Sequence, residues 1–193
     1  MSSQENVYDV PKDLPVPTDD GACDHLPGMR MPSLSLISTA GDPVDLSTLP
    51  GTTVVYCYPL TGRPDQNLPS GWDDIPGARG CTPQSCSFRD HHAELRQLGV
   101  RVFGLSTQDT AYQREAADRL HLPFLLLSDE KLEFARALAL PTFEAEGMTL
   151  IKRLTLLIEE GEIEHVFYPV FPPGRNAEVV VRWLSERSTA ERT

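Results

Sequence analysis

Apolar and polar residues alternate along the chain in patterns that predict a series of strands and helices. Residues 34–38 alternate like a strand, and residues 44–46 complete a hairpin after a glycine-containing turn. The β-branched run TTVVYCY, at residues 52–58, predicts a buried central strand that Pro59 ends. The same patterns predict strands at 100–106, 124–127, 148–158 and 163–170, and helices at 83–98, 110–121, 132–140 and 176–186.

This alternation of strands and helices is typical of an α/β fold. The turn at Glu160-Gly161 joins the last two strands so tightly that they must be antiparallel, which makes the sheet mixed. Such an order is compatible with a thioredoxin-like sheet flanked by helices. Because residues 1–30 are polar and proline-rich, we expect an N-terminal arm that is disordered or lies extended over the domain. Residues 31–187 then form one domain, and residues 188–193 a short tail.

Composition narrows the class of protein. The chain has 193 residues and a net charge of −11, and so acidic a protein is repelled by nucleic acids and by anionic membranes. No apolar run reaches about 18 residues, so we expect no membrane-spanning helix, and the first residues do not resemble a secretory signal. The four cysteines follow no disulfide-framework spacing, which favours a reducing compartment, the cytoplasm by default. We find no glycine motif for phosphate or dinucleotide binding and expect no cofactor and no metal.

Two of the cysteines occur in GCTPQSCSFRD, residues 80–90. Because proline is favoured in the first turn of a helix, Pro83 places Cys81 at a helix N-terminus, where free N–H groups and the helix dipole favour a thiolate. Cys86 falls on the second turn. Residues five apart on an intact helix have Cα atoms about 8.7 Å apart, whereas a disulfide needs them within about 7 Å. A bond between these two sulfurs would therefore require local unwinding.

The segment before this helix, residues 60–79, is rich in Gly, Pro, Asp and Asn and shows neither helical nor strand periodicity. Loops of this length inside a compact domain are uncommon and often functional. We interpret Trp72 as a hydrophobic anchor that tucks the loop down, with a partner-docking surface as the alternative. Arg63 and Arg79 are candidate positive charges beside a thiolate, although solvated loop charge is the simpler interpretation.

Four segments together resemble the peroxiredoxins, and within them the bacterioferritin-comigratory or Q type: GCTPQSCSFRD, GVRVFGLSTQD, LPFLLLSD and the run Arg153–Ile158. The resemblance covers roughly residues 28–186. It implies a thioredoxin-like fold and a thiol-dependent peroxidase. Taken position by position, it implies that Cys81 is the peroxidatic cysteine, Cys86 the resolving cysteine and Arg153 a strand arginine facing the thiolate. Pro59 matches the proline that closes the strand leading into the active-site loop.

The active-site loop departs from the family pattern at its threonine. The family loop runs Pro-x-x-x-Thr-x-x-Cys, and the position three residues before Cys81 is Ala78. The hydroxyl that helps to orient the peroxide in the family is therefore missing from that position. Thr61 takes over its role, or Thr82 does, or no such hydroxyl is needed.

The spacing and one further position also depart from the family. Pro59 lies 22 residues before Cys81, far more than in the family, so residues 60–79 are largely an insertion. The glutamate that is common three residues after the peroxidatic cysteine is Gln84 in this chain, a milder change. We expect these departures to affect rate and substrate shape more than the type of reaction.

The other two cysteines have simpler interpretations. Cys57 falls in a predicted buried strand and is interpreted as core packing. Cys23 falls in the arm and is interpreted as an idle thiol, with Cys81 or a second subunit as alternative partners. For Cys81 and Cys86 themselves, the alternative is that they are two structural thiols that happen to lie close and have no chemical role.

The resemblance also implies a catalytic cycle. A thiolate that attacks a peroxide needs an ionised sulfur, donors for the departing oxygen and a way to recycle the sulfenic acid. Arg153 and the backbone N–H groups around Cys81 would supply the donors, and Cys86 would recycle the sulfur through an intrachain disulfide that thioredoxin or glutaredoxin reduces.

We therefore expect a cytoplasmic thiol peroxidase, a monomer or homodimer, that reduces hydrogen peroxide or organic hydroperoxides. One alternative is a redox sensor that uses the same cysteine pair to switch a partner protein. A second is a general thiol–disulfide oxidoreductase, against which the absence of any C-x-x-C pair argues.

Overall fold

The fold is described from a computed structural model of the chain, which places residues 10–190. Residues 1–9 of the predicted arm and 191–193 of the predicted tail lie outside the described residues. In chain order the elements are β1 (Leu36–Ser38), β2 (Pro43–Val44), the 3-10 helix η1 (Leu46–Thr48), β3 (Thr52–Cys57), η2 (Trp72–Asp74), α1 (Cys81–Asp90), α2 (His92–Gln97), β4 (Arg101–Ser106), α3 (Thr110–Arg119), β5 (Leu125–Ser128), α4 (Glu133–Ala137), β6 (Thr142–Ala145), β7 (Met148–Ile151), β8 (Leu154–Glu159), β9 (Glu162–Phe167), η3 (Pro173–Arg175) and α5 (Asn176–Ala190).

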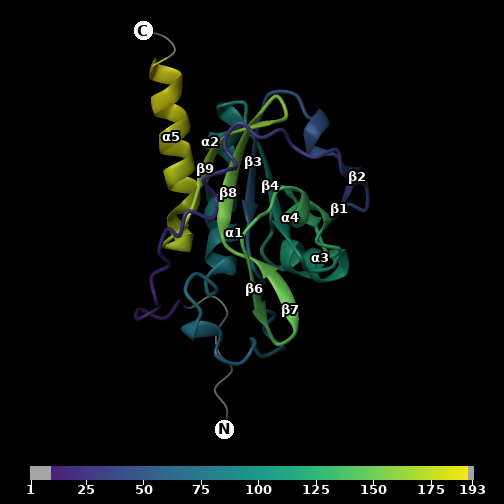
Figure 1. Cartoon of the computed structure of the whole chain (residues 1–193), viewed down its shortest axis with the longest axis vertical. Helices are drawn as coiled ribbons and strands as arrows, with labels where there is room; N and C mark the ends of the chain where they lie inside the picture. Colours follow the sequence, from purple (N-terminus) through teal and green to yellow (C-terminus); the bar gives the residue numbers. More distant parts are fainter. Residues whose placement is uncertain (1–9, 191–193) are drawn as a thin grey trace.

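Seven of the strands form one mixed sheet, in the order β2-β1-β5-β4-β3-β8-β9. The pairs β3–β4 and β4–β5 are parallel, because helices α1, α2 and α3 carry the chain back between them. The remaining pairs are antiparallel, including β8–β9, which the turn at Glu160-Gly161 joins. This arrangement confirms the predicted α/β fold, with a mixed sheet and an N-terminal hairpin, β1–β2 (Figure 1).

The central strand β3 separates two apolar cores, because successive side chains of a strand point to opposite faces of its sheet. Val54 and Tyr56 face a core that α1, α2 and α5 complete. Val55 and Cys57 face a core that α4, η1 and the arm complete. Figure 1 shows α5 on one side of the sheet and α4 on the other. A strand covered on both faces has a continuous apolar sequence, which is what residues 52–58 show.

Two of the predicted elements are wrong in the same way, since each is divided in the structure. Residues 148–158 form two strands, because the chain leaves the β6–β7 hairpin at Ile151 and enters the main sheet at Leu154. Strand β6 was not predicted at all. The helix expected at 83–98 is divided into α1 and α2 at His91, whose ring nitrogen Nδ1 lies 2.9 Å from the carbonyl oxygen of Ser87.

The end of the arm packs onto the domain, as in the second of the two alternatives for residues 1–30. Cys23 and Leu26 are buried in the core on the α4 side of the sheet, so Cys23 is a core residue and not a mobile thiol. The backbone N–H of Gly28 donates to the carbonyl of Ile163 at 2.7 Å, along the edge strand β9. The arm therefore covers a strand edge that would otherwise be unpaired there.

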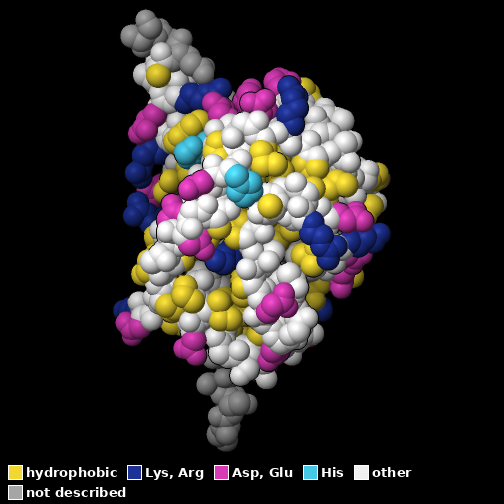
Figure 2. All heavy atoms as spheres, viewed as in Figure 1, with side chains coloured by type: hydrophobic (Ala, Val, Ile, Leu, Met, Phe, Trp, Pro, Cys, Tyr) yellow, Lys and Arg dark blue, Asp and Glu magenta, His cyan; other side chains and the backbone are white. Residues whose placement is uncertain are grey.

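Within residues 10–190, no helix has the length and apolar character that crossing a membrane requires. On the face that Figure 2 shows, acidic and basic side chains are interspersed and separated by small apolar areas.

Candidate active site

The 60–79 insertion is anchored to the β6–β7 hairpin. Trp72 is 3% exposed, and its ring centroid lies 6.0 Å from that of Phe143 on β6. The backbone N–H of Ser70 donates to the carboxylate of Glu146, in the turn between β6 and β7, at 2.9 Å. These contacts confirm Trp72 as the hydrophobic anchor of the loop, and they give the unpredicted hairpin a role as its support.

The beginning of the insertion is tied to residues around α3. The backbone N–H and the hydroxyl of Thr61 lie 3.0 and 3.1 Å from the side-chain oxygen of Gln108. Arg63 lies 3.7 Å from the carboxylate of Glu115 on α3. The Thr61 hydroxyl is therefore engaged by Gln108, and the Arg63 charge by a carboxylate of α3.

Cys81 is the first residue of α1, where the sequence predicted it, and its side chain is buried. The preceding residue, Gly80, has φ = 108°, a left-handed conformation that favours glycine. A Cβ atom at Gly80 would lie 2.2 Å from Cγ of Pro173 in η3. Only glycine allows η3 to pack this closely on the start of α1, and this contact fixes the turn that carries Cys81.

Arg153 lies in the bend between β7 and β8, so its prediction as a strand residue is wrong. The chain passes from one sheet to the other at this point, and the bend directs the side chain toward the start of α1. The residue is only 4% exposed. A buried guanidinium must find hydrogen-bond acceptors for its donors, and the end of the insertion supplies them.

The guanidinium of Arg153 joins the end of the insertion to the sulfur of Cys81. Its Nη2 lies 3.2 Å from Sγ of Cys81, and also donates to the carbonyl oxygens of Ala78 at 2.9 Å and Arg79 at 3.2 Å. Its Nε donates to the carbonyl of Gly77 at 3.2 Å. In the described part of the chain this guanidinium bonds to no carboxylate, so no ion pair cancels its charge beside the sulfur.

Gln84 holds the remaining side of the guanidinium. Its side-chain oxygen accepts a hydrogen bond from Nη1 of Arg153, and its side-chain nitrogen donates to Oδ1 of Asn176 at 2.9 Å. The Thr155 hydroxyl donates to the same oxygen of Asn176 at 2.7 Å. A glutamate at position 84 would add a negative charge here, whereas Gln84 orients the guanidinium with a neutral amide.

Cys81 borders a cavity of only about 10 Å³. Cys81 and Thr82 of α1 form one part of its lining, and Leu60, Leu68 and Trp72 form another. That space is about what one water molecule requires. Of the two candidate hydroxyls, only that of Thr82 belongs to a residue that lines this cavity.

Cys86 is half-buried on the second turn of α1 and is a free thiol, like the other three cysteines. Burial raises its pKa above the ordinary thiol value, and the nearby Arg89 opposes this shift. Because α1 is continuous from Cys81 to Asp90, the two sulfurs belong to one intact helix. Helical geometry puts their Cα atoms about 8.7 Å apart, which is too far for a disulfide.

Arg79 and Asn176 also belong to this site; the sequence offered Arg79 only as the less favoured of two interpretations and did not identify Asn176. Arg79 lines the cavity beside Cys81, and its Nη1 lies 3.1 Å from a carboxylate oxygen of Asp73. Its interpretation as solvated loop charge is wrong, since it is buried. The proximity of Arg79 to Cys81 in sequence was the available signal, whereas nothing marks Asn176, at the start of α5, as a partner of Gln84.

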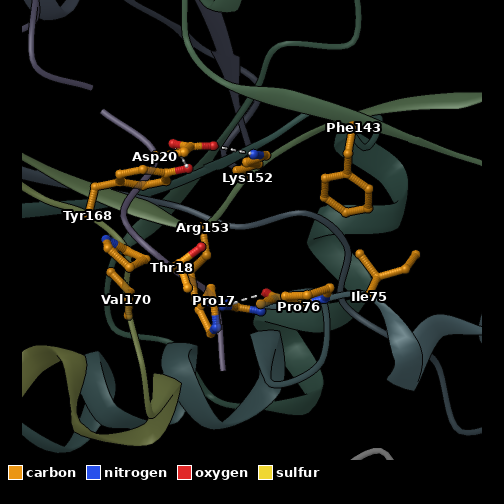
Figure 3. Close-up of a pocket in the computed structure, with 12 residues that line it drawn as sticks. Pro17, Thr18, Asp20, Ile75, Pro76, Phe143, Lys152, Arg153, Tyr168 and Val170 are labelled. Carbon is orange, nitrogen blue, oxygen red and sulfur yellow. Dashed lines mark hydrogen bonds and ion pairs between the residues drawn. The ribbon is translucent and has the colours of Figure 1, made fainter. Parts of the chain in front are cut away.

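A second and larger cavity, of about 230 Å³, lies beside Arg153 (Figure 3). Asp20 of the arm accepts hydrogen bonds there from Lys152 at 3.0 Å and from Tyr168 at 2.9 Å, which lower the pKa of this carboxyl to about 2. Phe143 lies at the opposite side of the cavity. Of these two cavities, Arg153 borders only the larger one and Cys81 only the small one.

Known proteins with similar sequences are named as peroxiredoxins. Residues 26–181 match the redoxin family. The chain is 33% identical to "Peroxiredoxin Bcp" of Escherichia coli, over 81% of this chain and 94% of that protein. It is 29% identical to "Peroxiredoxin Q, chloroplastic" of Oryza sativa subsp. japonica, over 77% of this chain and 62% of that protein.

Among solved structures, the fold is similar to peroxidoxin BcpB from Mycobacterium tuberculosis. The TM-score is 0.67 at 23% identity, and the match covers 84% of this chain and 98% of that one. A PrxQ mutant from Xylella fastidiosa gives the same TM-score at 20% identity, over 85% and 98% of the two chains.

The fold, the buried thiol at a helix start and these relatives define a thiol-dependent peroxidase with a thioredoxin-like domain. More narrowly, the chain belongs to the redoxin family and, within it, to the Bcp and Q-type peroxiredoxins.

Proposed function

We propose that this peroxiredoxin reduces hydroperoxides with Cys81 as its peroxidatic cysteine. The observation that carries the proposal is the 3.2 Å hydrogen bond from Nη2 of Arg153 to Sγ of Cys81 at the start of α1. A guanidinium without a carboxylate partner stabilises negative charge on the sulfur, and the free N–H groups of the helix start add to this effect. The guanidinium is therefore already in place beside the sulfur before a substrate arrives.

The first chemical step transfers one oxygen atom. The Cys81 thiolate attacks the terminal oxygen of the hydroperoxide, and the S–O bond forms as the O–O bond breaks. The sulfur is oxidised by two electrons to sulfenic acid. The other oxygen leaves with the electron pair and takes up a proton, which gives water or an alcohol. Arg153 donates to this leaving oxygen, and Thr82 is the residue of the cavity whose hydroxyl replaces the one missing at Ala78.

The second step forms a disulfide. The Cys86 thiolate attacks the sulfur of Cys81 and expels the sulfenic oxygen, which leaves as water after protonation. Because the intact helix holds the two residues too far apart, the first turns of α1 must unwind. Unwinding breaks the hydrogen bond that Gln84 accepts from Arg153 and the one that it donates to Asn176, which together hold the first turn in place.

The third step needs two electrons from outside the chain. A dithiol protein of the thioredoxin or glutaredoxin class would supply them by thiol–disulfide exchange. We infer a cytoplasmic location, where four free thiols persist and such reductants operate. We also infer a monomer or a homodimer, which sedimentation equilibrium would distinguish.

Peroxidase kinetics of three proteins test the roles of the two cysteines. We expect Cys81→Ser to abolish turnover, and Cys86→Ser to keep one rapid oxidation but to lose thioredoxin-supported cycling. Peptide mapping of the wild type after one equivalent of peroxide should recover a Cys81–Cys86 disulfide. Full activity of Cys81→Ser would overturn the proposal, and recovery of only intermolecular disulfides would overturn the role of Cys86.

A further inference from the structure

Access to the sulfur of Cys81 is limited by apolar side chains of the insertion. Cys81 is 3% exposed, and the cavity beside it has room for about one water molecule. Leu60, Leu68 and Trp72 form the apolar wall of this cavity. Leu68 and Trp72 belong to the inserted residues, so this wall is a feature of this chain that the shorter family loop does not provide.

The wall is held in position from several directions. Leu60, Leu68 and Trp72 pack in one apolar cluster with Ala145 and Leu150 of the β6–β7 hairpin. The end of the insertion is fixed to Arg153 by three carbonyl oxygens, and its middle is fixed to the β6–β7 turn by a hydrogen bond of 2.9 Å. Moving the wall away from Cys81 would break packing and hydrogen bonds together, so the space beside the sulfur does not widen freely.

We propose that the 60–79 insertion is a steric filter that selects hydrogen peroxide over hydroperoxides with bulky apolar groups. The inference rests on the proposed function of Cys81. In hydrogen peroxide the leaving oxygen carries only a hydrogen atom. In cumene hydroperoxide it carries a branched carbon with a phenyl ring, which would overlap Leu68 or Trp72. Because the wall is apolar, size and not polarity excludes this substrate, and an enlarged cavity should accept it.

A pair of matched truncations within the same cluster tests the filter. Leu68→Ala widens the cavity beside Cys81, whereas Ile75→Ala removes a similar volume from a residue that borders the other cavity. The second-order rate constant for loss of the Cys81 thiol is measured by rapid quenching, with hydrogen peroxide and with cumene hydroperoxide. A first oxidation needs no reductant, so recycling does not affect it. Circular dichroism verifies that both variants are folded, and Trp72→Phe is a milder second variant.

We expect the wild type to react at least about tenfold faster with hydrogen peroxide than with cumene hydroperoxide. Leu68→Ala should reduce this ratio of rate constants by about tenfold or more, Trp72→Phe should reduce it less, and Ile75→Ala should leave it at the wild-type value. Equal rates for both substrates in the wild type, or equal shifts of the ratio in Leu68→Ala and Ile75→Ala, would overturn the filter alone. Failure of hydrogen peroxide to oxidise any of the proteins would overturn the proposed function as well.

Discussion

The central sheet separates two pairs of cysteines, and the buried Cys81 differs from the buried Cys23 and Cys57 in its polar surroundings. Cys81 and Cys86 lie on α1, on the face that α1, α2 and α5 cover, whereas Cys23 and Cys57 lie in the core on the α4 face. Cys57 is even less exposed than Cys81. Burial raises the pKa of Cys23 to about 12 and that of Cys57 further still. The Cys81 sulfur, in contrast, has a helix start and a guanidinium beside it.

If Cys81 is the reactive cysteine, as we propose, its polar partners and not its exposure distinguish it from Cys23 and Cys57. Cys57 ends β3, the strand that leads through Pro59 into the insertion and on to Cys81. Strand alternation turns Tyr56 toward the Cys81 face and Cys57 away from it. The sheet therefore separates the Cys57 sulfur from that of Cys81.

Removing the guanidinium of Arg153 should have the largest effect on the rate of Cys81 oxidation, because this guanidinium is the main difference between the surroundings of Cys81 and those of Cys57. We expect Arg153→Met to slow oxidation of Cys81 by about 100- to 1,000-fold, as loss of a donor to developing negative charge does elsewhere. Arg153→Lys should lie between the wild type and Met, because lysine keeps the charge but not the planar fork. Rapid-quench thiol labelling measures the rates, and urea unfolding verifies that both variants are folded. Wild-type rates in Arg153→Met would show that the helix start alone activates the sulfur.

The turn before Cys81 allows a second test, now of how the reactive face is held. Gly80→Ala places a methyl group against Pro173, while Gly99→Ala, also at positive φ, meets open space. We expect each to lose about 1–2 kcal/mol from backbone strain, and Gly80→Ala to lose a further 1–3 kcal/mol or so from overpacking. Because the clash exists only while α1 is wound, Gly80→Ala should also speed disulfide closure.

Urea unfolding and timed trapping of the Cys81–Cys86 disulfide measure these two effects. If Gly80→Ala and Gly99→Ala were equally stable, the packing of η3 on the first turn would not contribute to holding Cys81 in place.

The features of the site also differ in how far the sequence predicts their positions. The buried strand at 52–58 and the position of Cys81 could be predicted, because β-branched runs and a proline near a helix start are local signals. The bend at Arg153 could not, because the apolar residues on either side continue while the chain changes from one sheet to another. The site depends on that bend, since it directs the guanidinium to Cys81.

Burial of Cys23 and of Arg79 was missed for a related reason. Each lies in a segment whose composition is polar and rich in turn-forming residues, and only tertiary contacts bury it. Composition indicates that such segments are mostly exposed, but it does not indicate which single residue tertiary contacts will bury. Burial of Trp72 could be predicted, because the large apolar surface of a tryptophan in a polar loop favours packing against the domain.

A change of pH should have a smaller effect, on the rate of disulfide closure, which is the step assigned to Cys86. Burial raises the pKa of Cys86 in the wound helix. The protonated thiol therefore stabilises the wound helix when the pH is below the ordinary thiol pKa. This stabilisation is lost as the pH rises through the raised pKa of the wound state. Unwinding exposes Cys86 and returns its pKa toward the ordinary value. Closure should therefore accelerate with pH, by up to about tenfold per unit in the range below that value.

Trapping the sulfenic acid and the disulfide separately, after one equivalent of peroxide, measures closure independently of the first oxidation. A closure rate that stayed constant between about pH 6 and pH 8 would contradict attack by a Cys86 thiolate.

The smallest effect on catalysis should come from the buried thiol on the far face. Cys57→Ser places a hydroxyl in an apolar core and should reduce the free energy of unfolding by about 1–3 kcal/mol, while Cys57→Ala leaves a small cavity and should cost less. Neither should alter the rate at which peroxide oxidises Cys81, because no atom of Cys57 lines the cavity beside that sulfur. Urea unfolding measures the free energy of unfolding of each variant, and rapid-quench labelling measures its rate of Cys81 oxidation. A peroxide rate that fell in step with stability would mean that the two faces of the sheet are coupled, and that burial on one side governs reactivity on the other.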